Sequence, residues 1–154
     1  GRELDDLDDA AWDATLDVNL RAGAMLCREL HAPLRAAGPG SAVVLVSSIE
    51  GHFGSAILPA YCASKAGVLG LTRSAAQHLA PDGIRVNIVT PGWIMTQRQI
   101  DLWLTPEAEE NLIRQQCLKT KVYPIDIARM VLWLASDDSK MCTSQLWVVD
   151  GGRM

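Results

Sequence analysis

Apolar residues recur at helical spacing over the first forty or so positions of the chain. Asp8 or Asp9 can cap such a helix at its start, and the Gly38-Pro39-Gly40 turn ends it. Its apolar positions are Trp12, Leu16, Leu20, Met25, Leu26 and Leu30. The pattern therefore predicts a helix from residue 9 to about residue 38, with Pro33 as the candidate for a bend in its last turns.

Short continuous apolar runs then alternate with further helical patterns. The runs that predict strands lie at residues 42–46, 84–89 and 146–149. The patterns that predict helices lie at residues 59–79, 106–117 and 125–136. Continuous aliphatic runs are typical of parallel strands that are buried on both faces. The order predicts an α/β fold, a doubly wound Rossmann-type parallel sheet of about three strands with flanking helices.

Composition narrows the classes of function. The 154 residues are 49% hydrophobic and carry a formal charge of −4, with Lys and Arg scattered, so no nucleic-acid partner is expected. No apolar run approaches the roughly 20 residues that cross a bilayer, and the acidic start has no apolar signal core. We therefore expect a cytoplasmic protein with no membrane partner. The four cysteines form no Cys-x-x-Cys pair, which predicts reduced thiols and no metal site.

The first candidate for a catalytic site is a pair of residues, Tyr61 and Lys65. Tyr61 and Lys65 stand four residues apart at the start of a predicted helix and therefore share one helix face. Chance gives a tyrosine such a lysine about one time in twenty, so the pair alone is weak. Three further features accompany this pair along the chain. They are Asn19 in the first predicted helix, Ser48 at the end of the strand before the pair, and the segment at residues 85–92 after it. Together they make coincidence a poor explanation.

This set resembles the short-chain dehydrogenase/reductase family over essentially the whole chain. The family's tetrad of Asn, Ser, Tyr and Lys maps onto Asn19, Ser48, Tyr61 and Lys65. The resemblance implies an enzyme that moves a hydride between a CH–OH group and NAD or NADP. Tyr61 would then be the acid/base, Lys65 its activating cation, Ser48 the group that orients the substrate, and Asn19 the holder of a relay water.

The resemblance also assigns the cofactor side. Tyr61 and Lys65 would contact the cofactor, and the nicotinamide would be held by Pro91, Gly92, the Ile94 backbone and the Thr96 hydroxyl. Residues 150–152 match the family's C-terminal signature. No glycine-rich phosphate-binding spacing occurs in the 154 residues. We therefore expect residues 1–154 to form the catalytic half of an NAD(P)-binding domain whose N-terminal glycine-rich half is absent.

Oxidation of an alcohol requires residues of these types whatever the family. Oxidation of an alcohol requires a base within hydrogen-bond reach of the hydroxyl proton. A free phenol ionises near pH 10, so it serves as that base near neutrality only when a positive charge stabilises the phenolate. A lysine ammonium about 4 Å away contributes roughly 4 kcal/mol at an effective dielectric constant of 20.

The segments at residues 96–107, 116–119, 134–139 and 141–143 are similar to the sugar dehydrogenases of this family. That similarity favours oxidation of an aldose to its lactone, and leaves reduction of a ketone or a 3-oxoacyl ester as the alternative. His52, Trp93 and Arg98, with Ser48 and Tyr61, are the candidates for substrate contact. Trp93 could equally be a packing residue, and His52 a solvated loop residue.

A hypothesis of a different class is an inactive fragment. Such a chain would keep the tetrad without holding a dinucleotide, and the strand at residues 43–46 would present an open edge that favours association. In the intact family, the helices that carry Asn19 and Tyr61 pack against a second subunit. A homo-oligomer, dimer or tetramer, is expected in either case.

Overall fold

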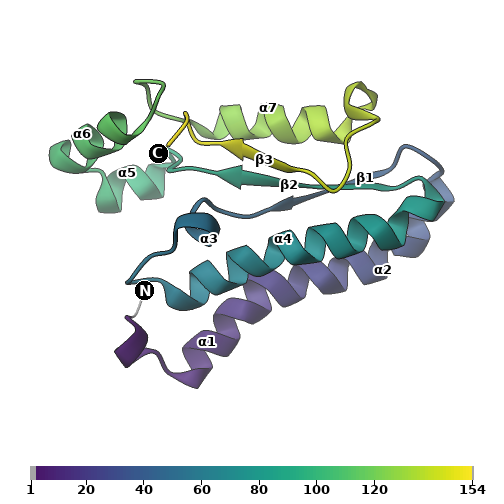
Figure 1. Cartoon of the computed structure of the whole chain (residues 1–154), viewed down its shortest axis with the longest axis horizontal. Coiled ribbons are helices and arrows are strands. Elements are labelled where there is room, and N and C mark those ends of the chain that lie inside the picture. Colours follow the sequence, from purple (N-terminus) through teal and green to yellow (C-terminus); the bar gives the residue numbers. More distant parts are fainter. Residues whose placement is uncertain (1–2, 154) are drawn as a thin grey trace.

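The computed structural model describes residues 3–153, and its centre is a parallel sheet of three strands in the order β1-β2-β3 (Figure 1). The strands are β1 (Ala42–Val46), β2 (Arg85–Pro91) and β3 (Leu146–Val149). Val44 pairs with Asn87, and Thr90 pairs with Val148. This confirms the predicted parallel α/β arrangement. β2 runs two residues beyond its predicted end because β3 pairs with its last four positions.

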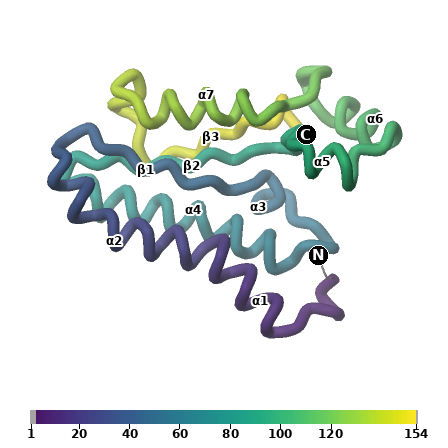
Figure 2. The backbone as a smooth tube through the Cα atoms, turned by 180° about the vertical axis from the view of Figure 1, so that it is seen from behind, coloured from purple at the N-terminus to yellow at the C-terminus, as the bar shows by residue number. Residues whose placement is uncertain are grey.

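Helices cover the two faces of this sheet (Figures 1 and 2). The helices α2 (Ala22–Ala37) and α4 (Pro59–Leu79) lie on one face, and α7 (Pro124–Ala135) lies on the other. Val86, Ile88 and Val89 of the central strand have no exposed surface. The core therefore sits around β2, between the two helical layers.

The first helix is continuous but not uniform. α1 (Asp9–Leu16) leads into a π-helical turn (Asp17–Arg21) and then into α2. The Ala22 N–H donates to Asp17 O, five residues back, which is the bond that defines such a wide turn. Asp8 caps α1 by accepting a hydrogen bond from the Ala11 N–H at 2.7 Å. The single helix predicted from residue 9 thus contains one irregular turn, at Asn19.

The structure adds two short helices that the pattern did not predict, α3 (Glu50–Phe53) and α5 (Gln97–Trp103). α6 (Pro106–Gln115) ends two residues before its predicted end, and α7 is shifted by one residue. Three 3-10 turns complete the described chain: Leu4–Asp6, Ala80–Asp82 and Asp137–Ser139. Among residues 3–153, no helix is long and apolar enough to cross a membrane.

β1 forms one edge of the sheet, and here the prediction of a strand buried on both faces was wrong. Its residues are only half-buried, and Val46 is 46% exposed. A cavity of about 260 Å³ lies beside the strand, between α2 and α4, and Asn19 and Lys65 are among the residues that line it. Among the described residues, β1 therefore has a continuous apolar sequence but pairs with a neighbouring strand, β2, on one side only.

Candidate active site

Tyr61 and Lys65 lie in the first two turns of α4, which begins with Pro59 at a position where the missing N–H costs nothing. The Lys65 Nζ is 5.7 Å from the centre of the Tyr61 ring and donates to Val46 O at 3.1 Å. Burial of the ammonium lowers the pKa of Lys65. Lys65 therefore joins the Tyr61 helix to the carboxyl end of β1.

Ser47 and Ser48 follow β1 directly and are buried. The Ser47 hydroxyl donates to Lys65 O at 2.7 Å, and the Ser48 hydroxyl accepts from the Glu50 N–H at 3.2 Å. The backbone N–H of Ser47 continues the sheet by donating to Val89 O at 2.8 Å. Ser48 is thus held at the carboxyl end of the sheet, the edge at which ligands bind in folds of this kind.

Asn19 reaches the same helix from the π-helical turn. Its Nδ2 donates to the Ser64 hydroxyl at 3.2 Å, which in turn donates to Tyr61 O at 2.7 Å. Leu20 approaches Gly67 so closely that a Cβ there would lie 2.8 Å from a Leu20 methyl carbon. The close approach of the two helices brings Asn19 onto α4. Asn19, Ser48, Tyr61 and Lys65 are therefore linked through α4 and the end of β1.

Two serines in this network were missed by reasoning from the sequence. Ser47 and Ser64 are 5% and 0% exposed, and each bonds the backbone of a residue of the tetrad. The one signal available was position: Ser47 directly precedes Ser48, and Ser64 stands three residues after Tyr61 on the same helix.

The segment after β2 is held by the end of β3. The Gly92 N–H donates to Val149 O at 3.0 Å, and a Cβ at Gly92 would lie 2.6 Å from Asp150 Cβ. Ile94 pairs with Val122 in an isolated parallel bridge, which uses the N–H of Met95. The Thr96 hydroxyl caps α5 by accepting from the Gln99 N–H at 3.3 Å, and its own hydrogen remains available to donate.

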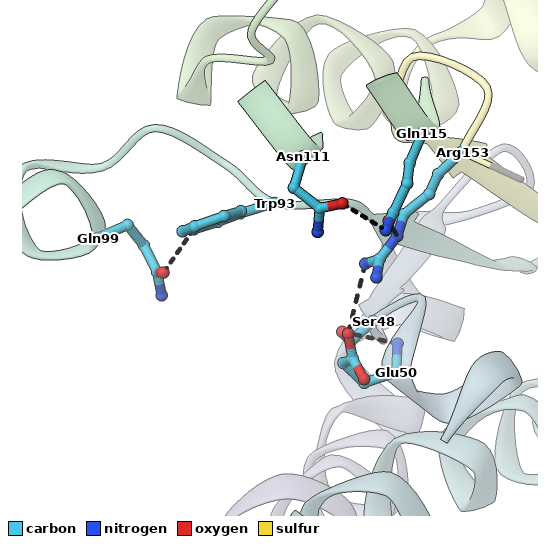
Figure 3. Close-up of polar contacts among 7 residues, drawn as sticks. All are labelled: Ser48, Glu50, Trp93, Gln99, Asn111, Gln115 and Arg153. Carbon is cyan, nitrogen blue, oxygen red and sulfur yellow. Dashed lines mark hydrogen bonds and ion pairs between the residues drawn. The ribbon is translucent and has the colours of Figure 1, made fainter. Parts of the chain in front are cut away.

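The three further substrate candidates lie on or beside α3 and α5. Trp93 donates through Nε1 to Gln99 Oε1 at 2.7 Å, and its indole points towards α5 (Figure 3). The Arg98 guanidinium is exposed and stacks over the Trp103 ring at 5.7 Å. His52 is exposed on α3. In the described chain, the polar contacts found for Trp93 and Arg98 stay within their own segment, and none of them joins Ser48.

A family profile with the description Enoyl-(Acyl carrier protein) reductase matches residues 1–153. The chain belongs to the short-chain dehydrogenase/reductase family. The predicted membership is confirmed. Short-chain dehydrogenase/reductase relatives include D-xylose 1-dehydrogenase of Caulobacter vibrioides (strain NA1000 / CB15N). It is 41% identical over 150 residues, which cover 97% of this chain and 60% of that protein.

A second relative is the probable galactose dehydrogenase GalD of Rhizobium meliloti (strain 1021), 41% identical over 149 residues, 97% of this chain and 58% of that protein. The solved structure of 4-hydroxyisoleucine dehydrogenase complexed with NADH superposes with a TM-score of 0.86 at 29% identity, over 98% of this chain and 63% of that one. The 3-oxoacyl-[acyl-carrier protein] reductase of Brucella melitensis ATCC 23457 gives 0.90 at 28% identity, over 99% and 56%. The chain spans about 60% of the length of its curated short-chain dehydrogenase/reductase relatives.

The donor set at this edge of the sheet suits an NAD(P)-type cofactor and an alcohol. It offers one ammonium, one phenol and hydroxyl groups beside the carboxyl ends of parallel strands. Within residues 3–153, no group of three or more His, Cys, Asp or Glu side chains could hold a metal ion. The phenol and the hydroxyl groups of this set can both donate and accept hydrogen bonds.

Proposed function

We propose that this protein oxidises an aldose at its anomeric carbon to the lactone, with NAD or NADP as hydride acceptor. The observation that supports it most is the Tyr61–Lys65 pair on α4, together with 41% identity to proteins named D-xylose 1-dehydrogenase and probable galactose dehydrogenase. The bound nicotinamide ring supplies the hydride acceptor. The protein supplies the proton chemistry.

Tyr61 takes the proton of the anomeric hydroxyl as the hydride leaves the carbon. The Lys65 Nζ, 5.7 Å from the centre of the Tyr61 ring, places a cation beside the group that takes this proton. Ser48 donates a hydrogen bond to the substrate oxygen and fixes its direction.

Asn19 holds the start of α4 through Ser64 and positions the relay that returns the proton to solvent. On the cofactor side, the residues proposed to hold the nicotinamide are Pro91, Gly92, the Ile94 backbone and the Thr96 hydroxyl. His52, Trp93 and Arg98 are proposed to line the sugar side, on or near α3 and α5.

The substitution Tyr61→Phe tests the chemical role. We expect turnover to fall by about 100-fold to 10,000-fold, because general acid–base catalysis contributes that much. Tyr123→Phe is the matched control, since it removes the only other phenol of the chain, 45% exposed at the start of α7. The assay is the appearance of reduced nicotinamide with D-xylose and D-galactose, for the purified protein with each cofactor.

A Tyr61→Phe variant that kept its turnover would remove the proposed role of Tyr61. Turnover with 3-oxoacyl esters or simple ketones, and with no aldose, would instead support the reductase as the second candidate, which structural likeness to a 3-oxoacyl reductase favours. Absence of both cofactor binding and turnover would support the inactive fragment.

We also propose a cytoplasmic homo-oligomer, dimer or tetramer, that packs through α2 and α4. The exposed apolar side chains of α2, which include Met25, Leu26 and Leu30, support it. Light scattering after size-exclusion chromatography measures the mass. A monomer at micromolar concentration would contradict the proposal.

A further inference from the structure

Arg153, near the C-terminal end of the chain, contacts two elements that are far apart in the sequence (Figure 3). Its backbone pairs with Gln116 in an antiparallel bridge, and its Nε donates to Gln115 Oε1 at 3.2 Å. Its Nη1 lies 3.5 Å from Glu50 Oε1, and its guanidinium carbon lies 5.8 Å from the centre of the Phe53 ring. We propose that Arg153 is a positioning residue that fixes α3, and with it Ser48, against the end of α6.

The α3 end of this link touches the tetrad. The Glu50 N–H donates to the Ser48 hydroxyl at 3.2 Å. On the other side of α3, a Cβ at Gly51 would lie 2.9 Å from the backbone of Lys65 and of Ala66. α3 therefore fits closely between Ser48 and the Tyr61–Lys65 helix. A shift of α3 would change the position of Ser48 relative to Lys65.

The α6 end of the link is anchored firmly. The Cys117 N–H donates to Gly152 O, and the Leu118 N–H donates to Gly151 O, both at 2.9 Å. Gln115 donates in turn to Asn111 Oδ1 at 3.3 Å, one turn earlier on α6. The C-terminal segment is therefore fixed to the end of α6 by its backbone, so the Arg153 side chain extends from a rigid base.

The chemistry of the contact calls for arginine. One planar guanidinium can donate to a carboxylate and an amide oxygen while its face stacks on an aromatic ring, which a lysine ammonium cannot do at once. The Arg153 and Glu50 side chains are 28% and 26% exposed, so solvent screens this pair less than a fully exposed one. Because it concerns the position of Ser48, the inference rests on the proposed function.

Hydrogen exchange and kinetics on the same variants test the link. We expect Arg153→Gln and Glu50→Gln each to speed amide exchange at residues 49–54 by about twofold to fivefold, the range for a single ion pair of this kind. The double variant should exchange no faster than Arg153→Gln alone, because that change already removes the contact with Glu50. Arg114→Gln is the matched control: the Arg114 side chain bonds Asn111 within α6, and its removal should leave residues 49–54 unchanged.

For the aldose reaction, each single change should lower kcat/KM, Arg153→Gln by at least as much as Glu50→Gln, and the double change by no more than Arg153→Gln. Unchanged exchange at residues 49–54 in Arg153→Gln, or additive effects in the double variant, would overturn the proposal. If the unsubstituted protein turned over no aldose, the proposed function would fail. The exchange measurement would still decide whether Arg153 positions α3.

Discussion

The close approach of Gly92 to Asp150 makes a substitution with a calculable outcome. In Gly92→Ala, the new Cβ would lie 2.6 Å from Asp150 Cβ and 2.8 Å from Asp150 Cα. Attractive carbon contacts lie at about 3.5–4.0 Å, so the overlap is close to 1 Å. Asp150 Cα belongs to the backbone and cannot rotate away. The chain after β3 must therefore move, which weakens the bond from the Gly92 N–H to Val149 O.

Overpacking of this kind costs about 1–3 kcal/mol, and a clash with the backbone belongs in the upper half of that range. We therefore expect Gly92→Ala to lose about 2–3 kcal/mol of unfolding free energy. With a urea m-value of about 2 kcal/mol per molar, the unfolding midpoint falls by about 1–1.5 M. Urea titration followed by tryptophan fluorescence and by circular dichroism measures that midpoint.

Gly70→Ala is the matched control. It makes the same chemical change within α4, where nothing lies within 4 Å of the added Cβ. Since glycine in a helix interior is less favourable than alanine by about 0.5–1 kcal/mol, we expect Gly70→Ala to raise the midpoint. If Gly92→Ala left the midpoint unchanged, or moved it in the same direction as Gly70→Ala, the steric reasoning would be refuted.

Two further changes test the packing at the start of β2 and the charge of Lys65 in the candidate site. Arg85→Lys removes the guanidinium that donates to Leu134 O, Ser136 O and the Ser139 hydroxyl. We expect it to cost about 2–3 kcal/mol, and an unfolding midpoint equal to that of the unsubstituted protein would contradict this. Because burial lowers the pKa of Lys65 below its ordinary 10.5, the unfolded chain holds more protons in that alkaline window, and stability contributed by this site rises with pH there. Lys65→Met should lose this contribution, and an identical pH slope in urea titrations of both proteins would show the reasoning to be wrong.

Local sequence patterns predicted the elements that show a clear helical periodicity or a continuous apolar run. The helix at residues 59–79 has the same bounds in the structure, and the strand at residues 42–46 does too. α5 escaped prediction because seven residues hold too few helical repeats to show a periodicity. The exposure of β1 could not be read from its apolar run, since burial depends on which strand lies beside it.

The same distinction separates the parts of the candidate site. Tyr61 and Lys65 were found because their spacing is a local property of a helix. The contact between Glu50 and Arg153 joins residues that lie 103 positions apart, and nothing in either neighbourhood indicates the other. The bond from Asn19 to Ser64 joins residues 45 positions apart, and it depends on the close approach of two helices at Gly67.

The π-helical turn at Asp17–Arg21 matters for the candidate site, through Asn19, rather than for the packing of the helices. Such a turn holds one more residue than an α-helical turn, so deleting one residue there would restore a regular helix while α1 and α2 kept their packing faces. Each residue step in an α-helix turns a side chain by about 100°, so the Asn19 side chain would swing away from Ser64. A change in chain length by one residue at this turn can therefore remove the bond from Asn19 to Ser64 while leaving the layers of the molecule in place.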